Sequence, residues 1–123
     1  MMTLADAIIE EDIESIKTLL RHSEDVNQID EYGFTPLTEA AIVDNINITQ
    51  LLLERGADPN QQDVTGGTPL QWAVENNNQA LVKLLLKNRA DPNMSNFAGQ
   101  PVLTMPMLRH QSEMRQLLIQ AGA

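Results

Sequence analysis

Apolar and polar positions alternate along this chain in a way that predicts short helices separated by tight turns. Between residues 13 and 20, Ile and Leu recur at intervals of three and four, which predicts a helix with one buried face. Leucine triplets fill 51–53 and 84–86, and Gly, Thr and Pro precede each apolar stretch. The pattern predicts helices near 36–43, 46–55, 69–76 and 79–88, with the leucines facing inward.

Two long stretches of the chain are near copies of each other, 33 positions apart. Thr35-Pro36-Leu37 recurs as Thr68-Pro69-Leu70, and Ala-Asp-Pro-Asn occupies both 57–60 and 90–93. Proline at the first position of a helix loses no hydrogen bond there, and Gly33 and Gly66 suit tight turns. A fixed period with this many coincidences is an internal repeat of helix pairs joined by turns.

On these motifs the chain resembles the ankyrin-repeat family, whose units have G-x-T-P-L at the head and A-D-x-N at the tail. The resemblance implies an all-α solenoid of stacked antiparallel helix pairs joined by β-hairpin-like loops, with almost no sheet. It also implies one ankyrin-repeat domain over 1–123, with repeats near 1–29, 30–62, 63–95 and 96–123. Two family asparagines, Asn60 and Asn93, are conceivable substrates of an asparaginyl hydroxylase.

The first and last units depart from the pattern. Residues 1–29 align without a hairpin and look like a capping repeat, with Thr3 predicted to cap the first helix. Asp12, Asn45 and Asn78 form a column of predicted caps for the second helices.

Two residues in the third and fourth units also break the pattern. Arg89 stands where a helix-ending Gly is expected, which should strain or reshape the end of the helix near 79–88. Pro106 falls inside the first helix of the last unit, which is therefore expected to be short, shifted or kinked.

Composition narrows the class of protein. The chain has 123 residues, no Cys and a net charge of −9, so we expect no disulfide framework, no cofactor and no nucleic-acid partner. No signal peptide or membrane-length apolar run is present, which indicates an intracellular, cytoplasmic protein without membrane insertion. Nine acidic residues lie within 1–31, and they either solvate that face or attract a partner with a basic surface.

The sequence offers no catalytic constellation and no metal site. His22 and His110 are far apart in the repeats and lack further ligands at metal spacing. The Gly66-Gly67 pair is not followed by a Lys and is explained as a hairpin. The acidic run at 10–12 lacks the spacing of a calcium loop. We therefore expect a protein that is not an enzyme.

In the resembled family, partners bind a concave surface made of hairpin tips and the exposed side of each first helix. Trp72 is expected to pack between repeats, whereas aromatic residues on the hairpins are candidate anchors. The first unit would add Ile9 and Glu10 to this surface. The predicted protein-binding residues are Glu31, Tyr32, Phe34, Ile42, Val43, Val64, Thr65, Glu75, Asn76, Phe97, Gln100 and Arg109.

The resemblance implies a protein–protein interaction module. Two alternatives stay open: a recognition segment of a larger enzyme or effector, or a small stand-alone inhibitor similar to four-repeat kinase inhibitors. Leu117, Leu118 and Ile119 keep the last helix apolar, so we expect the native protein to continue past Ala123. The chain is expected to be monomeric, with weak self-association through its C-terminal repeat.

Overall fold

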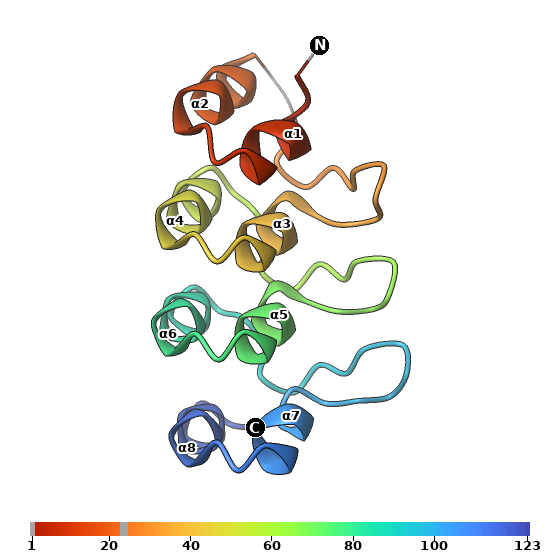
Figure 1. Cartoon of the computed structure of the whole chain (residues 1–123), viewed down its shortest axis with the longest axis vertical. Coiled ribbons are helices and arrows are strands. Elements are labelled where there is room, and N and C mark those ends of the chain that lie inside the picture. The colour runs from red at the N-terminus through yellow and green to blue at the C-terminus, as the bar shows by residue number, and fades with distance from the viewer. Residues whose placement is uncertain (1, 23–24) are drawn as a thin grey trace.

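The structure is a single stack of four helix pairs (Figure 1). It is a computed structural model that describes residues 2–22 and 25–123. Over these residues there are no strands, and the one isolated bridge joins Ser95 to Pro101. The predicted all-α solenoid is thus confirmed. Its helices are α1 Leu4–Ile9, α2 Ile13–Arg21, α3 Pro36–Ile42, α4 Ile46–Glu54, α5 Pro69–Glu75, α6 Gln79–Lys87, α7 Thr104–Leu108 and α8 Ser112–Gln120.

Threonine caps the first helix of three of the four pairs. Thr3 accepts the Asp6 N–H through its hydroxyl, and the Asp6 carboxylate accepts the Thr3 N–H in return. The Thr35 and Thr68 hydroxyls accept hydrogen bonds in the same way at the starts of α3 and α5, where Pro occupies the first helical position. These short helices therefore begin at positions that the sequence encodes locally.

The predicted caps of the second helices are confirmed. The side chains of Asp12, Asn45 and Asn78 accept the N–H three residues ahead at 3.1, 2.9 and 3.0 Å. In the last pair Gln111 takes this place, and no side chain caps α8. The column of short polar residues thus defines the start of the second helix in three repeats and is missing from the fourth.

Buried side chains, mostly Leu, Ile, Val and Ala, form one core that continues from repeat to repeat. First helices pack on first helices, α1 on α3, α3 on α5 and α5 on α7, while α4 packs on α6. Leu37, Leu52, Leu70 and Leu85, predicted to face inward, are at most 1% exposed. Each layer therefore buries its apolar face only against its neighbours, as expected of a solenoid.

Helix α7 is short and starts late, as expected from Pro106. It has five residues, against seven in α3 and α5, and no side chain caps its start. Its first residue is Thr104, two positions after the one aligned with Pro36 and Pro69. This shift places Pro106 in the first turn, where its missing N–H removes no helical hydrogen bond.

Arg89 keeps the shape of the helix end at the expense of backbone strain. Its φ is +73°, in the left-handed region that the aligned Gly56 also adopts at +92°. The following hydrogen bonds are the same in both repeats: Ala57 N to Leu52 O and Ala90 N to Leu85 O, each 3.0 Å. The sequence predicted either a strained or a reshaped helix end at Arg89, and the structure shows the strained one.

Asparagine side chains connect the end of one repeat to the end of the next. The Asn60 amide donates to the Arg89 carbonyl at 3.0 Å and accepts the Asp91 N–H at 2.7 Å. The Asn93 amide donates to the Gly122 carbonyl at 3.1 Å. The repeated Asp-Pro-Asn motif thus satisfies backbone groups at helix ends across each repeat boundary.

Candidate protein-binding surface

Three hairpin loops, 30–35, 63–68 and 96–101, project on the side of the first helices (Figure 1). Each is closed by the side chain of its first residue. The Asp30 Oδ1 atom accepts the N–H groups of Tyr32 and Phe34 at 2.9 and 3.1 Å. Asp63 and Asn96 make the corresponding bonds in the next two loops. A short acceptor at this position thus holds each loop closed on itself.

Successive hairpins also pack directly on each other. The Val64 N–H donates to the Gly33 carbonyl at 2.9 Å, and the Phe97 N–H donates to the Thr65 carbonyl at 3.0 Å. A Cβ added to Gly33 would overlap the Val64 side chain, and one added to Gly66 would overlap Phe97. Glycine is therefore required twice over at these positions, for its positive φ and for the close approach of the next loop.

An apolar row remains exposed along the hairpin tips. Tyr32, Val64 and Phe97 are 55%, 60% and 71% exposed and come from three successive loops. Large apolar side chains at such exposure are unusual enough, when aligned, to indicate a contact surface. We call the surface formed by the three hairpin loops and the C-terminal ends of α1, α3, α5 and α7 the hairpin face.

The structure places all twelve predicted binding residues on this hairpin face. Those on the loops are Glu31, Tyr32, Phe34, Val64, Thr65, Phe97 and Gln100, and those at helix ends are Ile42, Val43, Glu75, Asn76 and Arg109. Ile9 and Glu10 lie at the end of α1. Nine of the twelve are exposed, whereas Phe34, Ile42 and Val43 are half-buried.

Several of these residues also stabilise the stack. The Asn76 amide donates to the Ala41 carbonyl at 3.0 Å, so it joins α5 to α3. Arg109 donates to the Glu75 carbonyl at 3.0 Å and to its carboxylate at 2.9 Å, so it joins α7 to α5. Their mutation would perturb both stacking and surface, which makes them poor probes of binding.

Phe34 and Trp72 form an aromatic contact between neighbouring repeats. Their rings meet edge to face, with centroids 5.7 Å apart. The Trp72 indole N–H also donates to the Asp63 Oδ2 atom at 2.9 Å. Trp72 therefore packs between repeats, as expected. Phe34 is half-buried: part of its side chain packs on Trp72 and the rest is exposed to solvent.

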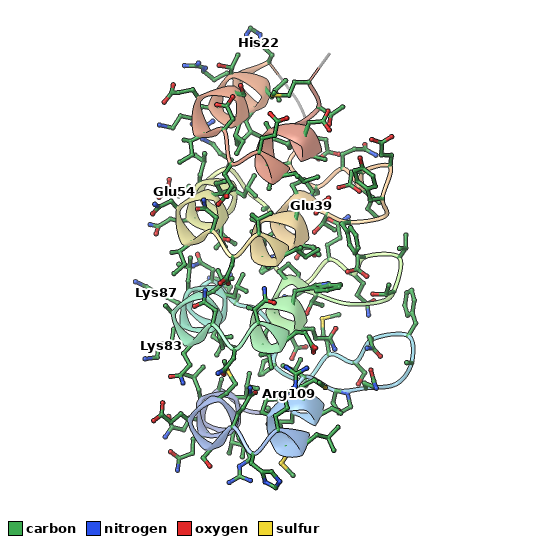
Figure 2. All side chains as sticks on the ribbon, viewed as in Figure 1. His22, Glu39, Glu54, Lys83, Lys87 and Arg109 are labelled. Carbon is green, nitrogen blue, oxygen red and sulfur yellow. The ribbon has the colours of Figure 1, made fainter. Side chains whose placement is uncertain are left out.

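The basic residues lie mostly on one side of the stack. Seven of the eight Lys and Arg residues lie on the second helices or just after them, and the exception, Arg109, is bound to Glu75. Figure 2 shows Lys83 and Lys87 on the α6 side, opposite the hairpins. The hairpin face instead carries the carboxyl groups of Glu10 and Glu31 in its N-terminal half, and the charge of Asp6 also acts on Tyr32 there. It therefore presents a negative field over the first two repeats.

That negative charge acts on Tyr32. The pKa of its phenol lies above the ordinary value because of the neighbouring Glu31 charge, with a smaller effect of burial. The pKa of the Asp6 carboxyl is lowered by its hydrogen bonds with Thr3. Tyr32 therefore stays protonated and can act as a hydrogen-bond donor within an acidic surrounding.

Sequence reasoning missed the carboxyl group of Glu39 and the role of Asp30. Glu39 is 4% exposed on α3, and burial, followed by the adjacent Asp30, raises the pKa of its carboxyl to about 8. The available signal was its alignment with Trp72, 33 positions later, which places an acid where the next repeat has an indole.

Sequence reasoning also missed a cavity of about 300 Å³ beside the first hairpin. It is lined by Thr3, Leu4, Ala5, Asp25, Gln28, Asp30, Glu31 and Pro36.

Across residues 2–22 and 25–123 no cluster of three or more His, Asp or Glu side chains could hold a metal ion. Nor does the described part of the chain contain a helix long and apolar enough to cross a membrane. Glu24, counted above among the acidic residues, lies outside the described residues.

The helix pairs, the hairpins and the closing asparagines define the class of this protein. A family model described as ankyrin repeats (3 copies) matches residues 4–96 and 56–123, so the chain belongs to the ankyrin-repeat family. This fold is typically a non-catalytic interaction module that binds other proteins. No curated protein matches the chain.

Among solved structures, the chain is similar to the Legionella effector AnkH. The two are 46% identical with a TM-score of 0.94, and the match covers 100% of this chain and 27% of that one. The chain thus spans about a quarter of the length of the effector. The similarity supports the fold over the whole length of this chain. The rest of that effector, and its action, lie outside the matched region.

Proposed function

We propose that this chain is a protein–protein interaction module that binds its partner on the hairpin face. The observation that carries the proposal is the row of exposed apolar side chains, Tyr32, Val64 and Phe97, on three successive hairpin tips. Rigid aromatic groups on a preformed surface bury a large area at small entropic cost, and interface hot spots are enriched in them. The loops are held closed by their own side chains, so little ordering is needed on binding.

We further propose that the partner presents a basic surface. The support is the distribution of the basic residues: the N-terminal half of the hairpin face has exposed carboxylates, whereas the basic residues of the chain lie mostly on the second-helix side. Such an arrangement speeds association with a cationic partner and disfavours an anionic one. It also favours one orientation, with the basic side of the partner above the first two repeats.

Phage-displayed random peptides provide a defined probe that does not require the natural partner. Peptides selected on the intact chain should bind the Tyr32→Ala and Phe97→Ala variants at least about tenfold more weakly, since an anchor of this kind contributes about 1.4 kcal/mol or more. The matched control is Lys83→Ala, which removes an exposed side chain from α6. Circular dichroism should show the same helix content in all three variants.

The composition of the selected peptides tests the second part of the proposal. An excess of Lys and Arg, with affinity that falls as salt rises, is the expected result. Peptides that bind Tyr32→Ala and Phe97→Ala as well as the unchanged chain would refute the hairpin face as the binding surface. Selected peptides without a basic excess would refute only the charge argument.

A second proposal concerns the setting in which the module works. Because the chain matches 27% of a Legionella effector over its own full length, we propose that it serves as the recognition segment of a longer effector. The small stand-alone inhibitor has no comparable observation in its favour. The expected cytoplasmic location and monomeric state belong to this proposal. Analytical ultracentrifugation, together with expression of the native reading frame, tests the oligomeric state and the length.

A further inference from the structure

The first residue of each hairpin faces one particular residue of the following helix. Asp30, Asp63 and Asn96 occupy the hairpin position, and Glu39, Trp72 and Met105 occupy the aligned helix position, nine residues later in each case. The three pairs differ in chemistry, and the first two share the same local backbone, since α3 and α5 begin at aligned prolines and have the same length. The hairpin residue has partners for its polar atoms in the third and fourth repeats, whereas in the second repeat one carboxylate oxygen has none.

In the third repeat the pair is fully satisfied. Asp63 is 2% exposed, its Oδ1 atom accepts the N–H groups of Thr65 and Gly67, and its Oδ2 atom accepts the Trp72 indole N–H at 2.9 Å. In the fourth repeat no such donor is needed, because Asn96 carries its own amide, which donates to the Gln100 side chain at 3.1 Å. In these two repeats the polar atoms of the hairpin side chain therefore all have hydrogen-bond partners.

In the second repeat that donor is missing unless Glu39 supplies it. The Asp30 Oδ1 atom is used by the loop, while its Oδ2 atom is buried with no hydrogen-bond partner. Glu39, which Figure 2 labels on α3, aligns with Trp72 of the next repeat. It is itself 4% exposed. A carboxyl group can donate a hydrogen bond only when it is protonated. The geometry therefore favours a protonated Glu39 that donates to the Asp30 Oδ2 atom.

The helices packed against α3 supply no cation in place of that proton. Helix α3 packs against α1, α4 and α5, and none of these helices contains Lys, Arg or His. The ionisable residues that they carry are Asp6, Glu54 and Glu75, which are all acidic. Burying two adjacent carboxylates without a counter-ion is strongly unfavourable.

We propose that the protonated Glu39 carboxyl donates a hydrogen bond to the Asp30 Oδ2 atom, and that losing this proton loosens the first hairpin and so regulates how Tyr32 is presented. Asp30 connects the two events because its side chain is close to Glu39 and its Oδ1 atom accepts the N–H groups of Tyr32 and Phe34. The regulatory part rests on the proposed binding function of the hairpin face. The proton itself is a property of the chain alone and can be measured without a partner.

The direction of the pH effect follows from linkage. The pKa of the Glu39 carboxyl rises from 4.5 to about 8 in the folded chain, through burial and then Asp30. The folded state therefore binds more protons than the unfolded state between these two values, so stability decreases as pH rises through this window. The contribution of this proton is complete below the lower value and is lost above the higher one.

The direct test is a carbon-13 NMR titration of the Glu39 carboxyl in the intact chain. We expect a midpoint near pH 8, and a midpoint at the ordinary value of glutamate would overturn the proposal. Glu39→Gln supplies a permanent amide donor of the same shape, so stability of this variant should lose its dependence on pH between 6 and 9. Glu54→Gln, an exposed acid on α4, is the matched control and should keep that dependence.

Hydrogen exchange tests the link to the hairpin, with an internal control. After correction for intrinsic rates, protection of the Tyr32 and Phe34 amides should fall by up to about tenfold from pH 6 to pH 7, inside the window between the two pKa values, and should level off above pH 8. The aligned Thr65 and Gly67 amides, held by Asp63, should not change, and nor should any of the four in Glu39→Gln. Equal loss in both hairpins would refute the coupling. These results stand even if Tyr32→Ala leaves peptide binding unchanged, which would refute the proposed function alone.

Discussion

Replacing Trp72 with Phe removes one hydrogen bond from a buried carboxylate and leaves most of the packing in place. The indole N–H lies 2.9 Å from the Asp63 Oδ2 atom, and Asp63 is 2% exposed. Phenylalanine retains an aromatic ring that can meet Phe34, so the edge-to-face contact is largely preserved. The substitution therefore reports mainly on the donor that the Asp63 carboxylate loses.

The expected loss of stability is that of a hydrogen bond to a charged, buried acceptor. Such a bond contributes about 1.5–3 kcal/mol, because water cannot replace the lost donor. A domain of this size changes its melting temperature by roughly 4 °C per kcal/mol. Trp72→Phe should therefore lower the melting temperature by about 6–12 °C.

A double-mutant cycle with Asp63→Asn separates the hydrogen bond from lost packing. Asparagine keeps the loop acceptor, as Asn96 does in the fourth repeat, and removes the buried charge. In that background Trp72→Phe should cost about 1 kcal/mol or less, measured by urea unfolding of all four proteins. Additive effects within about 0.5 kcal/mol would show that the two side chains are not coupled and would refute this reasoning.

Two further predictions concern backbone positions. Gly33→Ala should destabilise the chain by at least about 1 kcal/mol more than Gly56→Ala, because both have positive φ but only the Gly33 Cβ would overlap Val64; equal losses in urea unfolding would mean that the hairpins do not pack as described. Arg89→Gly should raise stability by about 0.5–1 kcal/mol in thermal unfolding, since it relieves a φ of +73°; a loss of stability would place the strain elsewhere.

Much of the fold could be predicted because its signals are local. Pro36 and Pro69 indicate where α3 and α5 begin, and the structure starts both helices there. The column of Asp12, Asn45 and Asn78 predicted three caps that are all present. Such features depend on residues three or four apart, so the sequence alone contains the necessary information.

The candidate surface could be predicted only in part. The 33-residue register placed Tyr32 and Phe97 on hairpins, but exposure was not encoded in it: Tyr32 is exposed, whereas Phe34, two residues later, is half-buried against Trp72. The pairing of Asp30 with Glu39 depends on how deeply α3 is covered by its neighbours. That depth arises from stacking of helices distant in sequence, which a pattern of single residues does not report.

The contacts between first helices have a mechanical consequence. Since α1 packs on α3, α3 on α5 and α5 on α7, a force that pulls the ends of this chain apart acts on a series of separate junctions. The weakest of these should open first, and α7, with five residues and no cap, forms the weakest. Under tension the stack should lengthen in discrete steps that begin at the fourth helix pair, so that it behaves as an extensible spacer whose first three pairs stay folded at low load.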